Sequence, residues 1–371
     1  MIYLDNAAAT RPCQPALDKA AFIQTECYAN PAAQHKFGLL AARELEQARA
    51  HVAAAMNVPE NRVFFTSGGT ESINTAITGA LYLNRRKGKH ILTCKTEHMS
   101  VLSPLKHLEA NGYQVEYLPP LPSGAVDADA VLNACRADTA LVTLMAVNNQ
   151  TGAQNPVEQI AKRLKAEHPQ VLFAVDGVAG FLKMRLDLKD IDFYSVSGHK
   201  AHAPKGSGAL YVRSGLNLPP LIHGGGQESG LRSGTPGLEA IAGFGQACLV
   251  GAQSFERDTE HMRALLNRAK TGLEALGGKV IGSPDAPHIL CMAISQDRSE
   301  VLMRKLEQRD IYISAASACT QNKKNHVLAA MNLGKSLADS AVRISLSRLN
   351  TPAEIDKFIA AAESIIKGET C

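Results

Sequence analysis

The feature that most constrains the fold is the alternation of short apolar runs with amphipathic helical stretches over the first two thirds of the chain. Several of these runs are apolar at almost every position, as strands are when both of their faces are covered. The stretches between them repeat apolar residues at helical spacing. This alternation predicts an α/β fold with a mostly parallel sheet. The seven expected strands span residues 63–67, 90–94, 115–119, 140–147, 171–176, 193–197 and 209–212.

The last third of the chain predicts a second, smaller α/β unit. Residues 237–276 are helical in pattern and lead out of the sheet, and shorter strand and helix patterns follow them. The Thr-Pro-Ala-Glu sequence at 351–354 is a capping box with proline at the first helical position, so a final helix is expected there. We therefore predict a large domain at 14–250 and a small domain formed by 1–13 and 251–371.

Composition argues against several classes of protein. The net charge of +4 comes from scattered residues, without the basic run that tracks a nucleic-acid backbone. No apolar run approaches the ~18 residues of a membrane span, and no signal peptide is visible. The eight cysteines form no CxxC pair, so we expect reduced thiols in a cytoplasmic protein and no metal site. From the charge distribution and the absence of a long apolar run, we expect neither nucleic acid nor membrane as a partner.

A candidate site begins in the Ser-Gly-His-Lys turn after the expected strand at 193–197. An amine that is partly desolvated at a strand end has a lowered pKa, and Lys200 is therefore a candidate Schiff-base lysine. A basic surface loop accounts for the same residues, so this turn alone leaves both interpretations open.

Four more strand ends carry polar residues, and a parallel sheet brings such ends to one edge. Residues 66–74 combine two glycines with Thr70 at a helix start, as a phosphate cup or as a plain capped turn. Asp176 is a candidate partner for a pyridine nitrogen or a helix cap. His98 is a candidate acid–base that stacks on a flat ring, or a capping histidine. Residues 148–150 offer amide groups at the same edge.

Taken together, these stretches resemble the pyridoxal-phosphate (PLP) enzymes of the class V aminotransferase family, and within it the cysteine desulfurases. The resemblance covers nearly the whole chain in family order and implies the PLP-dependent transferase fold of type I. It is carried by YLDNAAAT (3–10), NPAAQH (30–35), FTSGGTES (65–72), TEHMSVL (96–102), VNNQTG (147–152), VDG (175–177), SGHKAHAPKG (197–206), GGGQESGLRSGT (224–235), SAC (317–319) and VRISLSR (342–348).

The resemblance implies a role for each matching residue. Lys200 would bind PLP as a Schiff base, Asp176 would pair with its ring nitrogen, and His98 would stack on the ring as an acid–base. Cys319 would take sulfur from L-cysteine as a persulfide and leave alanine, and the polar loop after it, expected to be exposed and mobile, would present that sulfur to an acceptor protein. The remaining implied contacts are Gly69, Thr70, Asn149, Ser197 and His199 to the cofactor, Thr235 to the cofactor phosphate of the partner subunit in a homodimer, and Asn30 and Arg343 to the substrate carboxylate.

Three departures from the family pattern indicate a somewhat divergent member. Gln150 replaces a usual glutamate, Ala179 replaces a glutamine that contacts the phenolic oxygen of PLP, and residues 315–318 read Ala-Ala-Ser-Ala instead of Ser-Gly-Ser-Ala. Two alternatives stay open: a related PLP enzyme such as a selenocysteine lyase or an aminotransferase, and a weakly active paralogue that acts as a sulfur-transfer scaffold. The acceptor, an iron–sulfur scaffold or a thiolation carrier, is not named by the sequence.

Overall fold

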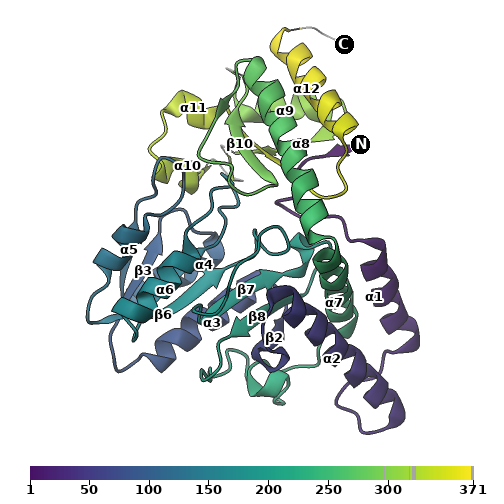
Figure 1. Ribbon diagram of the computed structural model, residues 1–371, viewed down its shortest axis with the longest axis vertical. Helices are drawn as coiled ribbons and strands as arrows, with labels where there is room; N and C mark the ends of the chain where they lie inside the picture. Colours follow the sequence, from purple (N-terminus) through teal and green to yellow (C-terminus); the bar gives the residue numbers. More distant parts are fainter. Residues whose placement is uncertain (296, 317, 320–322, 369–371) are drawn as a thin grey trace.

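The protein is described by a computed structural model that covers residues 1–295, 297–316, 318–319 and 323–368. Its largest element is a seven-stranded sheet (Figure 1). In spatial order the strands are β2 (Val63–Thr66), β8 (Gly208–Val212), β7 (Phe193–Ser197), β6 (Leu172–Asp176), β5 (Thr139–Met145), β3 (His90–Cys94) and β4 (Gln114–Leu118).

Strands β4, β3, β5, β6 and β7 run parallel, whereas β8 is antiparallel to both of its neighbours. The predicted α/β class and the mostly parallel seven-stranded sheet are therefore confirmed. Strand ends differ from the predicted ranges by at most two residues, because apolar character alone does not show where pairing stops.

Helices cover both faces of the sheet, which is why its strands are apolar at nearly every position. Along β7 the side chain of Phe193 joins an apolar cluster under α3 and α4, and the next residue, Tyr194, joins the cluster under α1, α2 and α7. The covering helices are α1 (Gln14–Glu26), α2 (Lys36–Met56), α3 (Gly69–Leu83), α4 (Met99–Ala110), α5 (Ala128–Ala134), α6 (Val157–Glu167) and α7 (Leu238–Gln253).

A second apolar core lies in the C-terminal third, under a four-stranded sheet of order β12-β15-β10-β9. The long helix α8 runs from the large sheet to this unit (Figure 1). The capping box that was predicted at 351–354 forms at the start of α12. The elements of this unit are α8 (Phe255–Ala275), β9 (Lys279–Val280), β10 (Ile289–Ala293), α9 (Ser299–Glu307), β11 (Ile311–Tyr312), β12 (Ser314–Ala315), β13 (Ala318–Cys319), β14 (Lys323–Lys324), α10 (His326–Ala330), α11 (Lys335–Asp339), β15 (Ala341–Ser345) and α12 (Pro352–Ile366).

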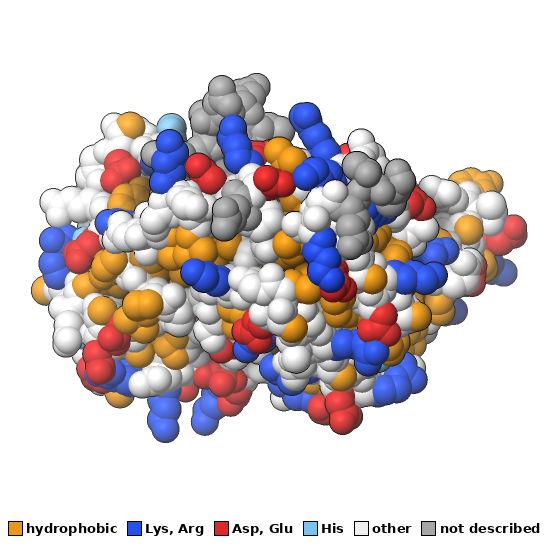
Figure 2. All heavy atoms as spheres, turned by 90° about the horizontal axis from the view of Figure 1, so that it is seen from above, with side chains coloured by type: hydrophobic (Ala, Val, Ile, Leu, Met, Phe, Trp, Pro, Cys, Tyr) orange, Lys and Arg blue, Asp and Glu red, His pale blue; other side chains and the backbone are white. Residues whose placement is uncertain are grey.

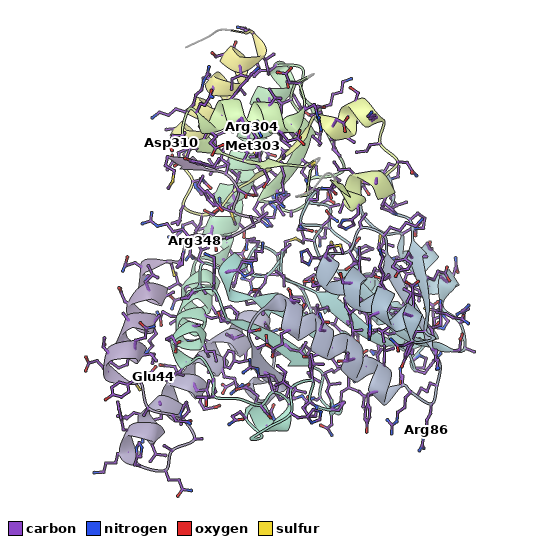
Figure 3. The ribbon with its side chains drawn as sticks, turned by 180° about the vertical axis from the view of Figure 1, so that it is seen from behind. Glu44, Arg86, Met303, Arg304, Asp310 and Arg348 are labelled. Carbon is purple, nitrogen blue, oxygen red and sulfur yellow. The ribbon has the colours of Figure 1, made fainter. Side chains whose placement is uncertain are left out.

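The two ends of the chain meet in this unit, since β1 (Ile2–Tyr3) pairs in parallel with β11. Helix α7 packs against α1 and α2, whereas α8 packs against α12. Arg348 lies where the two cores adjoin (Figure 3), and its Nη1 is 3.3 Å from Oδ2 of Asp258. This arrangement is compatible with the domain division at residue 250, which remains a prediction.

The surface that faces the viewer in Figure 2 carries interspersed Lys, Arg, Asp and Glu side chains, so its charges of opposite sign largely offset one another. Among the helices of the described ranges, none has the length and apolar character that a bilayer span requires.

Candidate active site

Lys200 lies in a single 3-10 turn (Gly198–Lys200) that follows β7 directly. Its Nζ donates to the carbonyl oxygens of Ala7 and Ala8, the latter at 2.7 Å, so the N-terminal segment lies against the amine. Burial and the nearby Arg343 guanidinium lower the pKa of Lys200 to about 8. The share of the amine that is neutral and nucleophilic close to neutral pH is therefore much larger than for an exposed lysine.

Asp176 is the last residue of β6 and is buried. Its Oδ1 accepts hydrogen bonds from the Val178 amide at 3.0 Å and from Ser195 Oγ at 3.4 Å. Burial raises the pKa of this carboxyl, while these hydrogen bonds, His98 and Lys200 act in the opposite direction. Both hydrogen bonds from described residues go to Oδ1, so Oδ2 can accept from a further cationic donor such as a protonated ring nitrogen.

His98 precedes α4 and caps it, because its Nδ1 accepts from the Ser100 amide at 3.1 Å. The capping role that the sequence left open is thus present, and it leaves Nε2 for proton transfer. Burial lowers the pKa of His98, with Lys200 and His326 acting in the same direction and Asp176 opposing them. The ring is therefore mostly neutral near pH 7, and because Nδ1 accepts a hydrogen bond, Nε2 carries the ring proton and can donate it.

The predicted phosphate cup lies between the start of α3 and the Lys200 turn. Gly68 at the N-cap of α3 forms no side-chain cap, so the first amides of the helix point at an open position. Gly69 allows the start of α3 to lie close to the segment that follows β6, since a Cβ at Gly69 would lie 2.4 Å from Val178 Cγ2. Ser197 Oγ lies 2.7 Å from Nδ1 of His199, whose pKa burial lowers to about 4. Thr70 is exposed at this helix start.

Arg343 on β15 reaches the loop after β5 and the N-terminal segment. Its Nη1 donates to the carbonyl oxygen of Asn149 at 3.0 Å, and Nη2 donates to Oδ1 of Asp5 at 2.7 Å. Its buried Nε has no hydrogen-bond partner within the described part of the chain. The structure thus brings Lys200, Asp176, His98, Ser197 and His199 to one edge of the sheet, as the sequence predicted. Arg343 reaches this edge from β15.

Comparison with known proteins assigns this arrangement to a family. The family described as Aminotransferase class-V matches residues 2–358. The chain belongs to the class-V aminotransferase family. It is 40% identical to the NifS/IcsS protein homolog of Lactobacillus delbrueckii subsp. bulgaricus, over 98% of this chain and 97% of that protein. It is 38% identical to the cysteine desulfurase IscS of Vibrio atlanticus, over 97% of this chain and 91% of that protein.

Solved structures of this family have the same fold. A NifS-like protein superposes with a TM-score of 0.93 at 34% identity, with 99% of each chain covered. A structure described as SspA in complex with cysteine gives 0.81 at 33% identity, over 95% of this chain and 100% of that one. The predicted PLP fold of type I, the PLP cofactor and the identification as a cysteine desulfurase are therefore confirmed.

The residues at the sheet edge fit the PLP cofactor of this family. The uncapped amides of α3, with Ser197 and His199, suit its phosphate, and Oδ2 of Asp176 suits a protonated pyridine nitrogen. A partly neutral amine at Lys200 suits its aldehyde carbon. The individual roles of these residues remain predictions.

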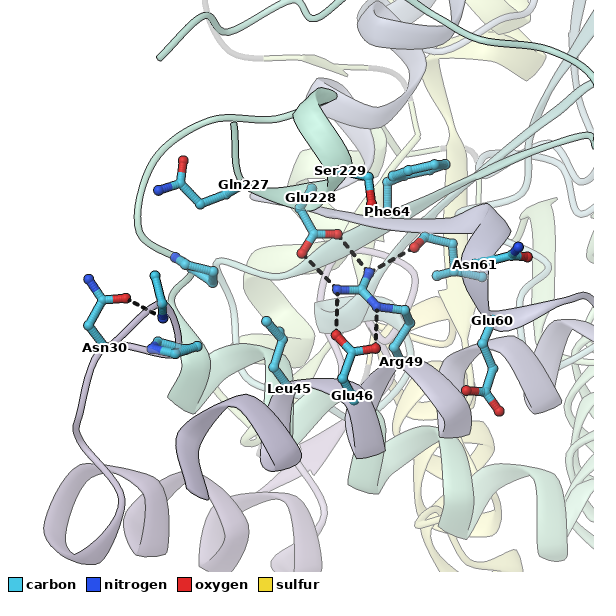
Figure 4. A pocket seen from close by; sticks show the side chains of 14 residues that line it. Asn30, Leu45, Glu46, Arg49, Glu60, Asn61, Phe64, Gln227, Glu228 and Ser229 are labelled. Atoms are coloured by element: carbon cyan, nitrogen blue, oxygen red, sulfur yellow. Dashed lines mark hydrogen bonds and ion pairs between the residues drawn. The ribbon is translucent and has the colours of Figure 1, made fainter. Parts of the chain in front are cut away.

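For two further predicted contacts, Asn30 and Thr235, the described contacts include none to Lys200, Asp176 or His98. The Asn30 side chain is exposed and folds back on its own turn, where Oδ1 accepts from the Ala32 amide at 2.9 Å. It lines a cavity of about 430 Å³ together with Arg49 and Glu228, which form a bidentate ion pair at 2.7 and 2.9 Å (Figure 4). The described contacts of Asn30 do not include Lys200, so its role as a substrate contact remains a prediction.

Thr235 is also exposed. The segment that carries it is tied to the phosphate cup, because Arg232 Nε lies 3.0 Å from Oε1 of Glu71 at the start of α3. The other oxygen of Glu71 accepts from the Ser67 amide at 2.9 Å. An exposed hydroxyl on a segment held in this way is compatible with a contact to a second subunit, which remains a prediction.

Cys319, the predicted nucleophile, lies in β13, and its backbone pairs with Lys323 of β14. Its side chain, Ser317 and residues 320–322 lie outside the described residues, so the predicted sulfur-presenting loop is not described. The structure describes Gln150, which replaces a glutamate usual in the family. Its side chain is buried, and its Nε2 lies 3.9 Å from Cys291 Sγ.

Two residues at the site, Asp5 and His326, received no role from the sequence, whereas an amide group of Asn148 was expected at this edge. Asp5 pairs with Arg343, and Asn148 shapes the loop after β5, where its Oδ1 accepts from the amides of Gln150 and Thr151, both at 2.9 Å. His326 contacts the turn that carries His98. Asp5 lies in the YLDNAAAT stretch (3–10), where an acidic residue beside several small residues was a signal that could have identified it. The sequence around His326 contains no comparable signal.

Proposed function

We propose that this PLP-dependent cysteine desulfurase removes the sulfur of L-cysteine with Lys200, His98 and Cys319 and passes it to an acceptor protein. The observation that carries the proposal is the meeting of Lys200, Asp176 and His98 at one sheet edge, with an uncapped helix start beside them. Bound PLP supplies an electron sink that stabilises negative charge on the substrate next to its amino group.

The protein residues bind the substrate and move its protons. Arg343 offers a buried, unpartnered Nε for the carboxylate of L-cysteine, beside Nη groups that Asp5 and Asn149 hold in place. The Lys200 amine accepts and returns a proton close to neutral pH, since its pKa is about 8. His98 is the second proton-transfer group: because Nδ1 accepts from the Ser100 amide, Nε2 of the neutral ring carries the proton and can donate it.

Sulfur transfer then involves Cys319. Its thiolate attacks the sulfur of L-cysteine, so that an S–S bond forms and the substrate Cβ–S bond breaks. The electron pair of the broken bond stays on Cβ, which takes up a proton and yields alanine. Cys319 is left as a persulfide, whose outer sulfur an acceptor thiol can remove. The exposed Thr235 supports a homodimer in which each subunit completes the phosphate site of the other.

Alanine release from L-cysteine in the presence of a reductant tests the proposal, together with detection of the persulfide by mass spectrometry. We expect Cys319→Ala to keep the visible absorbance of bound PLP and to lose both products. Cys135→Ala is the matched control, because burial raises the pKa of the Cys135 thiol to about 11 and makes it unreactive. Undiminished alanine release by Cys319→Ala, or a keto acid as the wild-type product, would overturn the proposal.

A further inference from the structure

One hydrogen bond crosses between the two cores directly beside His98. A ring nitrogen of His326, Nε2, lies 2.8 Å from the carbonyl oxygen of Glu97. A carbonyl oxygen only accepts, so this Nε2 carries the proton and donates. His326 is the first residue of α10 in the small sheet's unit, whereas Glu97 lies in the large unit, in the turn between β3 and α4.

The turn that receives this hydrogen bond is itself held to the central sheet by hydrogen bonds. The side chain of Glu97 is fully buried, and its Oε1 accepts from the Met145 amide of β5 at 2.8 Å. The neighbouring Thr96 carbonyl accepts from Nδ2 of Asn148 at 3.1 Å. The Glu97 carbonyl is therefore a fixed point on the central sheet, one residue before His98.

The other end of the contact is joined to the segment that carries Cys319. Asn325, next to His326, donates from Nδ2 to the carbonyl oxygen of Ala316 at 2.6 Å, and its Oδ1 caps α10 at the Val327 amide. The two ends of the segment between Ala316 and Asn325 are thereby held together. Because a chain spans at most ~3.6 Å per residue, the Cα of Cys319 lies within about 11 Å of the Cα of Ala316.

We propose that His326 is a positioning residue that fixes the base of the Cys319 segment against the His98 turn, so that the thiol is presented to substrate held at Lys200. This inference rests on the proposed function of Cys319. Without the hydrogen bond, this tie between the base of the segment and the central sheet is lost, and we expect Cys319 to be positioned less well for reaction. A misplacement of about 1 Å can lower a rate by roughly 10²-fold.

The experiment compares holoenzyme variants at two stages of a single turnover with L-cysteine. His326→Phe keeps a ring but lacks the donor, and His326→Gln keeps a donor. The first stage is followed as the change in visible absorbance when L-cysteine is added, and the second as the rate of persulfide formation on Cys319 by mass spectrometry. The exposed histidine of α4, in the variant His107→Phe, is the matched control.

We expect His326→Phe to lower the persulfide rate roughly 10- to 100-fold while the absorbance change keeps its rate and its L-cysteine dependence. His326→Gln should recover part of the loss, and His107→Phe should match wild type. Tryptic cleavage after Lys323 or Lys324 should be faster in His326→Phe, because its Cys319 segment has lost an anchor. If His326→Phe does not fold, His326→Ala takes its place in both measurements.

An unchanged persulfide rate in His326→Phe would overturn the inference, as would an equal loss at both stages, which would indicate a role in substrate binding or in the fold. Cys319→Ala in the same assay separates the two proposals. Persulfide that does not depend on Cys319 contradicts the proposed function, whereas Cys319-dependent persulfide that is insensitive to His326→Phe contradicts only the positioning role.

Discussion

Arg343 and Asp5, at opposite ends of the sequence, form an ion pair in which Nη2 lies 2.7 Å from Oδ1. The pair closes the N-terminal segment over the site, since Ala7 and Ala8 of that segment accept from the amine of Lys200. Ser314 Oγ donates to the same oxygen of Asp5 at 2.8 Å and stiffens the arrangement. The guanidinium that is proposed to hold substrate is thus oriented before substrate arrives.

Replacing Arg343 by lysine should weaken the binding of L-cysteine more than it slows turnover. Lysine keeps the charge but loses the planar set of donors that contacts Asp5, Asn149 and a substrate carboxylate together. Because a hydrogen bond to a charged group contributes about 1.5–3 kcal/mol, we expect KM for L-cysteine to rise roughly 10- to 100-fold. Steady-state kinetics with the exposed Arg304→Lys as control measure this; an unchanged KM in Arg343→Lys would exclude a direct contact with the carboxylate.

Lys183 should make the stability of the protein depend on pH. It is buried behind the Lys200 turn, where Nζ donates to the carbonyl oxygens of Lys200 at 2.6 Å and Phe181 at 3.3 Å. Burial, with Lys200 and Arg348 nearby, lowers its pKa from 10.5 to about 7. Between these values the unfolded chain binds more protons than the folded protein, so the free energy of unfolding should rise as pH is raised.

Burying the protonated Lys183 amine lowers the free energy of unfolding by its full amount below about pH 7, and this penalty disappears above about pH 10.5. Urea unfolding of the holoenzyme at pH 7 and pH 9 should therefore show a gain of roughly 1–3 kcal/mol in wild type. The gain should be smaller in Lys183→Met and preserved in the exposed control Lys189→Met. The same gain in all three proteins would contradict the assigned pKa of Lys183.

Asp192 should be among the most sensitive positions for stability. Its fully buried carboxylate accepts from Lys165 Nζ at 2.6 Å, from Arg213 Nε at 2.7 Å and from the Phe173 amide at 2.8 Å. Asp192→Ala leaves these donors without an acceptor, so we expect a loss of about 3–5 kcal/mol in the free energy of unfolding. Urea unfolding measures it, with Asp190→Ala as the control two residues away. Equal losses in the two variants would refute this role.

Much of the fold could be predicted because its signals are local. Strands such as β6 and β7 are apolar runs of the right length, and the capping box of α12 is contained in four residues. Asp176 and Lys200 could be identified as candidates because parallel strands bring their carboxyl ends to one edge. Each candidate had a simple alternative, and for His98 the capping alternative is present while the acid–base role remains a prediction.

The contacts that complete the site could not be predicted, because they join residues far apart in sequence. No local pattern links Arg343 to Asp5, or His326 to the carbonyl oxygen of Glu97, since a backbone carbonyl carries no residue identity. The lowered pKa of Lys183 depends on burial, which follows from packing rather than from its neighbours in sequence. The cavity that Asn30 lines together with Arg49 and Glu228 is equally a product of packing.

By itself, the sequence determined the class of sheet, the strand ends that carry chemistry and the family, because hydrophobic periodicity and short motifs are properties of neighbouring residues. Only the tertiary structure decided which of these residues meet and with what charge state. Distances between distant segments set both hydrogen bonding and desolvation, and desolvation sets the pKa values of Lys200, Asp176 and His98.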